Sequence, residues 1–276
     1  MADKFMKSIT FVEGGDAYYP LPKVTNADDG KVLKVVDGKW RLDDLIHLPY
    51  LSFIGNEDFT LKTNNTTKNW NGTLEYSTDT STWNTWNGTE ISSAGSKLYL
   101  RGTGNTKITG DSANYRFVFT GTDALKIACK GNIENLLDYE TVSAGGHPTM
   151  AIYCYASMFD SCTALTTAPK LSATTLADNC YAFMFGGCTS LTTAPSLPAT
   201  TLADYCYDYM FAGCTNIKLS TTQTGEYQTA YRIPTTGTGT TATSALLNMF
   251  VGTGGTFAGT PSINTTYYLS TNNTVV

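Results

Sequence analysis

The sequence predicts a mainly β protein with some helix (α+β), built from three consecutive parts. Three observations support this. Of 276 residues, 47 are threonine, strand-like runs alternate with Asn-Gly turns over 51–133, and a 26-residue unit repeats towards the C-terminus. Threonine is β-branched and favours strands, whereas Asn and Gly favour turns. We expect an N-terminal attachment or oligomerisation segment at 1–46, an antiparallel β-sandwich-like domain at 47–136, and a short solenoid with a degenerate C-terminal cap at 137–276.

The composition argues against several classes of function. Only 15% of residues are charged, and 41% are hydrophobic, enough to bury a core. The net charge is -5 without a basic block, so we expect no nucleic-acid partner. No apolar run reaches the length of about 18 residues that spans a bilayer, so we expect no membrane association. His47 and His147 are too few and too far apart for most acid–base or metal chemistry.

The N-terminal segment contains a hairpin signal. Residues 31–42, KVLKVVDGKWRL, are two strand-like runs around Asp-Gly, the dipeptide that favours a type I′ turn. An isolated hairpin is only marginally stable, so we expect it to pack on a partner chain or on virion proteins. The alternative is that it packs on the domain that follows. The apolar residues that would make the attachment or oligomer contact are Val32, Val35, Trp40 and Leu42.

The middle domain reads as short strands at 59–62, 73–76, 97–101, 115–119 and 125–129. Strands at this spacing, with Gly-containing turns between them, predict an antiparallel sandwich or jelly-roll-like domain. The stretch 131–139, GNIENLLDY, predicts a short helix that caps the repeats.

Three tryptophans of this domain are candidates for stacking on sugar rings, because an indole is flat and apolar with a polar edge. The alternative is packing in the core or in turns. They are Trp70, Trp83 and Trp86.

A 26-residue unit repeats from Cys154 with high sequence identity between copies. Segments 154–179 and 180–205 are identical at 19 of 26 positions without a gap, a third copy starts at Cys206, and a degenerate fourth starts at Met249. Within one copy, Cys180, Met184 and Cys188 follow an i, i+4, i+8 spacing, which predicts one stripe of a short helix. The next segment, 191–197, contains a proline and is expected to be extended. One such unit cannot bury its apolar stripe alone, so neighbouring copies must stack.

Six of the seven cysteines fall on the repeat, alternately 8 and 18 residues apart. They suggest either a disulfide ladder or metal site, or small buried hydrophobes that stack between copies. We favour buried hydrophobes, because an i, i+8 spacing along a helix separates Cα atoms by about 12 Å, too far for a disulfide. The cysteines are Cys129, Cys154, Cys162, Cys180, Cys188, Cys206 and Cys214.

Two resemblances add to this interpretation. The pattern CYxxMFxGCTSLTxAPxLPATTLA resembles the BspA-like leucine-rich repeats of gut bacteria and their phages, over about residues 130–276. The period here is a few residues longer than usual, and the copies are few. The phrase NADDGKVLKVVDGKW resembles hairpin modules near the N-termini of phage fibre and tail proteins, which implies an anchor or trimerising element.

Taken together, the resemblances imply a bacteriophage virion structural protein, most simply a head fibre or capsid decoration protein. The first 20 residues contain Lys4 and Lys7 but no apolar stretch of a secretory signal, which fits synthesis in the host cytoplasm and location on the virion surface. We expect a homotrimer attached to capsid or other virion proteins through its N-terminal segment. Alternatives are a tail fibre or receptor-binding protein, and a bacterial surface leucine-rich-repeat adhesin.

No catalytic motif is present, so we expect no enzyme, no cofactor and no catalytic or metal residue. Ligand contacts, for example with host-surface or mucus glycans, are expected at aromatic residues of the repeat, because tyrosine offers contact area at low entropic cost. The alternative is that these rings fill space between turns. The candidates are Tyr153, Tyr181, Phe183, Tyr205, Tyr207 and Tyr209.

Overall fold

The computed structural model describes residues 48–110 and 115–276, and the backbone of two strands nearer the N-terminus. The chain divides into two compact units, Met1–Leu48 and Pro49–Val276. The second unit is not divided further, so the expected boundary between 47–136 and 137–276 remains a prediction. One hydrophobic core cluster contains residues from both ranges.

The first unit contains the predicted hairpin. Strands β1 (Val32–Val36) and β2 (Lys39–Asp43) pair antiparallel, with Val36 opposite Lys39. This register is that of the hairpin the sequence predicts, and residues 37–38 between the strands lie outside the described residues. The side chains expected to make the attachment contact, those of Val32, Val35, Trp40 and Leu42, lie outside the described residues, as does His47.

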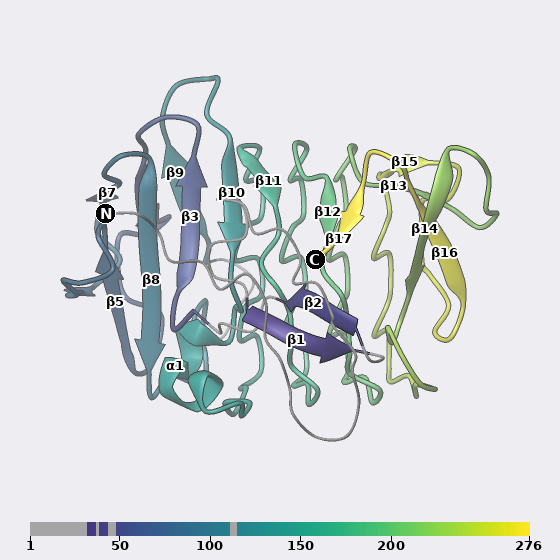
Figure 1. Ribbon diagram of the computed structural model, residues 1–276, viewed down its shortest axis with the longest axis horizontal. Coiled ribbons are helices and arrows are strands. Elements are labelled where there is room, and N and C mark those ends of the chain that lie inside the picture. Colours follow the sequence, from purple (N-terminus) through teal and green to yellow (C-terminus); the bar gives the residue numbers. More distant parts are fainter. Residues whose placement is uncertain (1–31, 37–38, 44–47, 111–114) are drawn as a thin grey trace, which may run out of the picture. The chain divides into compact units, whose positions relative to one another are not determined.

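The second unit begins with two sheets (Figure 1). The larger has the order β11-β10-β3-β8-β5-β6, and the smaller has the order β7-β4-β9. Each predicted strand is present with ends shifted by a few residues, so the mainly β prediction is confirmed. The bounds are β3 (Leu51–Gly55), β4 (Thr60–Thr63), β5 (Thr73–Ser77), β6 (Asn84–Trp86), β7 (Ile91–Ser92), β8 (Lys97–Thr103), β9 (Phe117–Thr120), β10 (Ile127–Lys130) and β11 (Leu165–Thr167).

The two sheets bury aromatic side chains against each other. The ring of Phe53 on β3 lies 6.5 Å from that of Phe117 and 5.1 Å from that of Phe119, both on β9. Phe53 also lies 6.3 Å from Phe159 of the first repeat. The core of the sheets is therefore continuous with the core of the repeats.

The predicted helix forms later than expected, as α1 (Asn135–Ser143), and it is interrupted at Asp138. The Asp138 backbone is extended, and its Oδ1 accepts a hydrogen bond from the Thr141 N–H at 2.9 Å, so this side chain caps the second half of the helix. α1 packs on the end of β8, where Gly102 is required because a Cβ there would overlap the carbonyl of Leu136.

The repeats contain no α-helix, so the helix predicted from Cys180, Met184 and Cys188 is wrong. Each copy contains a run of tight turns in which every fourth residue has a positive φ, for example Phe183 at 56°. Each turn is closed by an N–H that donates to the carbonyl three residues earlier, for example that of Met184 to Tyr181 at 3.2 Å. Alternate N–H groups donate to the next copy.

This four-residue unit turns two consecutive side chains inward and the next two outward. An inward residue therefore recurs every fourth position, the same spacing that a helix stripe shows. The sequence pattern alone cannot separate the two structures. We call the stacked segments 152–161, 178–187, 204–213 and 243–252 the turn ribbon.

Equivalent inward residues of the turn ribbon stack on each other. The rings of Phe159, Phe185, Phe211 and Phe250 are separated by 5.7, 5.5 and 5.4 Å in succession. Copies one to three follow each other at 26-residue intervals, but the fourth follows the third after 39 residues. Equivalent hydrogen bonds show this, because Asp178 bonds Asp204, 26 residues later, and Asp204 bonds Thr243, 39 residues later. The degenerate copy thus stacks in register because an inserted segment loops out.

Backbone groups outside the repeats cover both ends of the turn ribbon. At the first copy, the N–H groups of Ile108 and Phe117 donate to the carbonyls of Cys154 and Met158 at 2.9 and 2.8 Å. At the fourth copy, the Phe250 N–H donates to the Gly259 carbonyl at 3.0 Å. These contacts satisfy edge groups that would otherwise pair with another chain.

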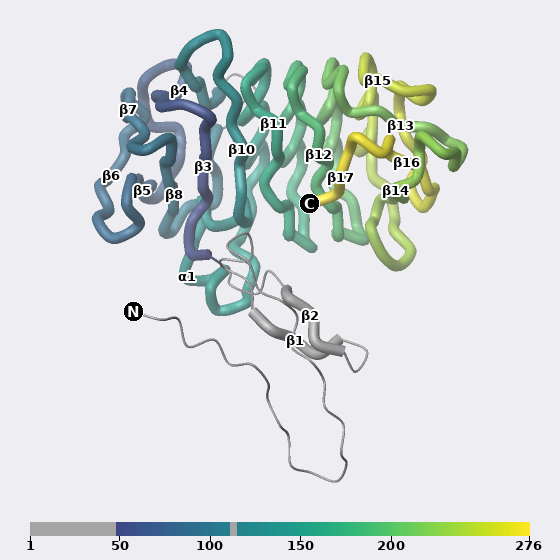
Figure 2. The backbone as a smooth tube through the Cα atoms, turned by 45° about the horizontal axis from the view of Figure 1, so that its top comes forward, coloured from purple at the N-terminus to yellow at the C-terminus, as the bar shows by residue number. Residues whose placement is uncertain are grey.

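The C-terminal strand returns to the middle of the repeats (Figure 2). It pairs in parallel with the short strand of the second copy, and the Val276 N–H donates to the Ala194 carbonyl at 3.1 Å. The remaining strands form the sheet β14-β16-β13-β15. Bounds are β12 (Thr193–Ala194), β13 (Lys218–Ser220), β14 (Tyr227–Arg232), β15 (Gly254–Gly255), β16 (Thr266–Ser270) and β17 (Thr274–Val275).

Candidate functional site

Two of the three candidate tryptophans belong to the core. Trp70 and Trp86 are 3% and 2% exposed, and their rings stack at 5.1 Å. Trp86 lies on the inward face of β6, opposite Leu74 of β5. Neither can contact a ligand, so the sugar-stacking prediction is wrong for both. Trp83, three residues before Trp86, is half-buried on the other side of the strand and stays a candidate.

Two of the six candidate repeat aromatics are also buried. Tyr181 and Tyr207 are each 1% exposed, and they stack in one column with Tyr155 at 5.5 and 5.8 Å. They follow the cysteine of each copy, and both positions of that pair point inward. The prediction of ligand contact is wrong for Tyr181 and Tyr207, because they fill space between copies.

The other four repeat aromatics lie on the outward side of the turn ribbon, which we call the ribbon face. Tyr153, Phe183, Tyr205 and Tyr209 all occupy positive-φ positions, which direct them away from the core. The rings of Phe183 and Tyr209 are parallel within 4° and 4.8 Å apart. The Tyr209 hydroxyl accepts a hydrogen bond from Nδ2 of Asn248 at 2.7 Å, which holds its ring in place.

The ribbon face carries most of the exposed large apolar side chains in the described part of the chain. Ile152 is 53% exposed, Leu247 and Val251 are each 38% exposed, and Tyr205 is 37% exposed. Isolated apolar residues on a surface need no explanation. Tyr205, Leu247 and Val251, however, lie on the adjacent third and fourth copies, which makes this end of the ribbon face a candidate binding surface, whereas Ile152 lies on the first copy. Sequence reasoning missed Ile152, Leu247 and Val251, which the four-residue period of the turns would have placed outward.

Carboxylates order the same face. Asp178 Oδ1 accepts a hydrogen bond from the Asp204 N–H at 3.1 Å, and Asp204 Oδ1 accepts one from the Thr243 N–H at 2.9 Å. Asp208 stands where the neighbouring copies have Ala182 and Leu247. Its Oδ1 is buried without a hydrogen-bond partner, and burial raises the pKa of this carboxyl to about 6.

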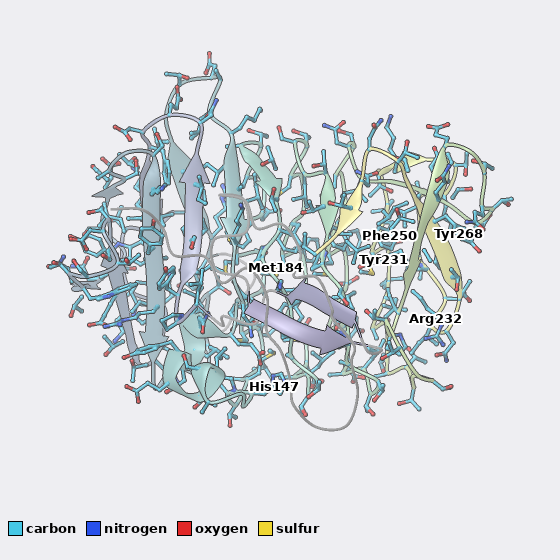
Figure 3. The ribbon with its side chains drawn as sticks, in the orientation of Figure 1. His147, Met184, Tyr231, Arg232, Phe250 and Tyr268 are labelled. Carbon is cyan, nitrogen blue, oxygen red and sulfur yellow. The ribbon has the colours of Figure 1, made fainter. Side chains whose placement is uncertain are left out.

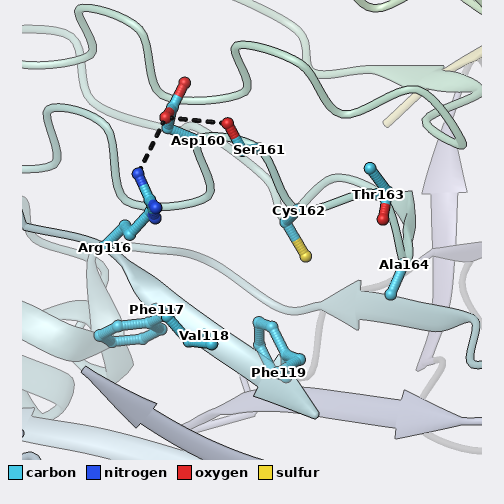
Figure 4. A pocket seen from close by; sticks show the side chains of 9 residues that line it. All are labelled: Arg116, Phe117, Val118, Phe119, Asp160, Ser161, Cys162, Thr163 and Ala164. Carbon is cyan, nitrogen blue, oxygen red and sulfur yellow. Dashed lines mark hydrogen bonds and ion pairs between the residues drawn. The ribbon is translucent and has the colours of Figure 1, made fainter. Parts of the chain in front are cut away.

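A cavity of about 190 Å³ lies where β9 meets the first copy (Figure 4). Arg116 Nη1 lies 3.4 Å from Asp160 Oδ2 at its rim. Cys162 also lines it, but burial raises the pKa of this thiol to about 11, so it is not a thiolate nucleophile at neutral pH.

The exposed His147 contacts a buried carboxylate, which the sequence did not reveal. Its Nδ1 lies 2.9 Å from Oε2 of Glu134, a residue that is 0% exposed, and the ring lies near α1 (Figure 3). Since a carboxylate only accepts, the imidazole N–H donates. Asn132 Nδ2 donates to the same carboxylate at 3.3 Å. This pair joins the start of α1 to the segment that leads into the first copy, which is a structural role for His147.

All seven cysteines are free and buried, as predicted for small hydrophobes. Desolvation raises the pKa of each thiol above its ordinary value, for example to about 12 for Cys214. Within 48–110 and 115–276, no three His, Cys, Asp or Glu side chains lie together in a way that could hold a metal ion. No helix in this part of the chain has the length and apolar character to cross a bilayer.

The ribbon face is therefore the surface with the strongest features for binding. It consists of rings, apolar side chains and ordered carboxylates on a rigid stack of turns. Comparison with protein-family models, with curated proteins and with solved structures gives no match.

Proposed function

We propose that the protein is a bacteriophage virion structural protein, a head fibre or capsid decoration, that presents the ribbon face to glycans of the host surface or of mucus. One observation carries the binding part of this proposal: Phe183, Tyr205, Tyr209 and Leu247 lie together on the outward side of stacked turns. Flat rings with polar edges suit sugar rings. Carboxylates such as Asp204 can accept hydrogen bonds from sugar hydroxyls.

The arrangement resembles a display scaffold more than an enzyme. Inward residues repeat between copies, whereas outward residues differ: Ser157, Phe183, Tyr209 and Asn248 occupy equivalent positions. A rigid frame with variable outward side chains favours binding, because the contact residues lose little freedom on complex formation. We propose that the protein has no catalytic activity and needs no cofactor.

The finer fold assignment belongs to the same proposal. We interpret the stacked copies as a short leucine-rich-repeat solenoid of the BspA-like type, and the two sheets before them as a β-sandwich-like domain. The hairpin β1–β2 would serve as the attachment and trimerising element that joins the protein to the capsid. Backbone cover at both ends of the turn ribbon supports a module that is presented singly within each chain, instead of polymerising end to end.

Electron microscopy of purified virions with antibody to the chain tests the location. Label on the capsid is the expected result. Label on the tail would favour a tail fibre or receptor-binding protein, and label on the bacterial surface without virion label would favour an adhesin. Either of these outcomes overturns the head-fibre proposal.

A further inference from the structure

A second surface with binding character lies far from the ribbon face in the chain, on the outer side of the six-stranded sheet. Strand alternation turns Leu98 and Leu100 of β8 into the core and turns Tyr99 and Arg101 outward. Arg101 pairs across the sheet with Glu75 of β5, and its Nε donates to Glu75 Oε2 at 2.8 Å. This contact fixes one edge of the guanidinium.

Two aromatic rings hold the same guanidinium. Its central carbon lies 4.1 Å from the ring centroid of Trp83 and 4.5 Å from that of Tyr139. Trp83 belongs to the loop after β5 and Tyr139 belongs to α1, so separate elements converge on Arg101. Both distances are within cation–π range. The side chain is held by three groups before any ligand arrives.

The loop that carries Trp83 is itself ordered by hydrogen bonds. Oδ1 of Asp79 accepts from the N–H groups of Ser81 and Thr82 at 2.9 and 2.8 Å. Those bonds keep the pKa of Asp79 well below its usual range. The indole Nε1 of Trp83 donates to the Thr80 carbonyl at 3.2 Å, so the ring is fixed at its edge.

The far end of the guanidinium remains available. Among the described residues, Nε of Arg101 bonds Glu75, whereas its two terminal nitrogens make no hydrogen bond. The side chain is 20% exposed. These two nitrogens are not among the buried side-chain atoms that lack a partner in the described part of the chain, so a ligand can reach their donors.

Charged side chains of both signs surround this end of the guanidinium. Lys97 and Lys130 project from the same side of the sheet, by strand alternation, and only Glu75 opposes them among its outward ionisable side chains. Carboxylates lie on the elements that hold Arg101 as well: Asp79 belongs to the Trp83 loop, and Asp138 and Glu140 flank Tyr139 on α1. The preference for an anion therefore comes from the free donors of Arg101 and not from the net charge of this face. The half-buried rings of Tyr50 and Tyr99 continue the aromatic surface from Trp83. The ring centroid of Tyr50 lies 5.9 Å from that of Trp83 and 5.1 Å from that of Tyr99.

We propose that Arg101 is the anchor of a second binding site, which takes the oxyanion of an acidic saccharide. The two terminal nitrogens donate side by side to a sugar carboxylate or to a sulfate ester, a geometry that matches the planar guanidinium fork. The neighbouring rings provide a flat apolar surface for the sugar that carries the charge. This site goes beyond the proposed function of the ribbon face, shares no residue with it and does not depend on it.

Calorimetric titration of the full chain with three related sugars tests this site. The probes are lactose, sialyllactose and sulfated lactose, which share a core and differ in having no anion, a carboxylate or a sulfate. We expect both anionic sugars to bind and lactose to bind at least about tenfold more weakly. The preferred anion identifies the source of the charge.

Two variants and a matched control locate the site. Arg101→Gln should weaken anionic-sugar binding about tenfold or more, and Arg101→Lys should do nearly the same because an ammonium lacks the planar fork. Arg116→Gln removes an equal charge from an arginine with no aromatic cage and should leave binding unchanged. Circular dichroism confirms folding of each variant.

Four outcomes would overturn the proposal. Three of them are anionic sugars that bind no better than lactose, full binding by Arg101→Lys, and equal losses in Arg101→Gln and Arg116→Gln; the fourth comes from a double variant. The double variant Tyr205→Ala/Tyr209→Ala tests whether the ribbon face contributes. It should leave binding of the anionic sugars intact, and a loss there would assign this binding to the ribbon face and overturn the second site.

Discussion

The rings of Phe183 and Tyr209 lie parallel and 4.8 Å apart on the outside of the turn ribbon, although the residues are 26 positions apart in the chain. Both backbones have positive φ, 56° and 50°. Left-handed backbone is costly for large residues. The protein places aromatic rings at strained positions facing solvent, an arrangement that core packing does not require.

The first prediction concerns this ring pair. Tyr209→Gly removes the ring and also relieves the backbone, because glycine adopts positive φ at no steric cost. We expect binding to host-surface glycans to fall about tenfold on a glycan array, with no decrease in Tm. Tyr268→Ala, which removes a half-buried tyrosine from β16, is the control and should bind normally. An unchanged array signal for Tyr209→Gly would remove the ring from the proposed binding surface.

The second prediction concerns Asp208 and pH. Burial raises the pKa of this carboxyl from 3.8 to about 6 in the folded protein. The cost of the charge in the folded state is therefore absent well below pH 3.8, grows as pH rises from about 4 to about 6, and is fully present above that range. Asp208→Ala, which copies Ala182, should stabilise the protein by about 1 kcal/mol at neutral pH, since solvent screens this half-exposed group.

Urea unfolding at two pH values checks this second prediction. The gain of Asp208→Ala over the unsubstituted protein should disappear near about pH 3, below the ordinary pKa of 3.8, where the carboxyl is mostly protonated in both states. An equal gain at acidic and neutral pH would show that packing, and not ionisation, causes the difference.

The third prediction concerns Asn273, which is 2% exposed and links three parts of the chain. Its Nδ2 donates to the carbonyls of Thr192 and Asn216 at 3.0 and 2.8 Å, and its Oδ1 accepts from the Lys218 N–H at 3.0 Å. Asn273→Ala leaves these groups unpaired and should cost about 3 kcal/mol of unfolding free energy. Asn272→Ala, at the exposed neighbour, should change stability little; equal effects would refute the linking role.

The fourth prediction concerns the left-handed turns. Gly213 has φ of 72°, and a Cβ there would meet its nearest atom at 3.7 Å, an ordinary contact. Gly213→Ala therefore pays only the backbone cost, about 1 kcal/mol. Gly225→Ala, in open space without a positive φ, should have no such cost in thermal unfolding. A stable Gly213→Ala protein would mean that the turns can relax.

Several features were predictable because they depend on local chemistry or on exact repetition. The β1–β2 hairpin follows from Asp-Gly between apolar runs, and the strands of the middle domain follow from β-branched residues between turns. The cysteines were correctly assigned to the core as small hydrophobes that stack between copies, although the helical spacing used to exclude a disulfide does not exist in the structure.

The candidate site was predicted only in part. Tyr153, Phe183, Tyr205 and Tyr209 lie outward, but Tyr181 and Tyr207 do not. Composition and spacing treat all six alike. Their direction depends on which of the four turn positions each residue occupies, and the helical interpretation assigned those positions incorrectly.

By itself, the sequence determined that this chain is mainly β, that it stacks 26-residue copies, and which residue types fill each copy. Only the tertiary structure decided that the copies are turns and not helices, because the choice depends on hydrogen bonds between copies, such as that from the Tyr155 N–H to the Cys180 carbonyl. It also decided that Arg101, Trp83 and Tyr139 meet. Those contacts join residues far apart in the chain, so a local sequence pattern cannot predict them.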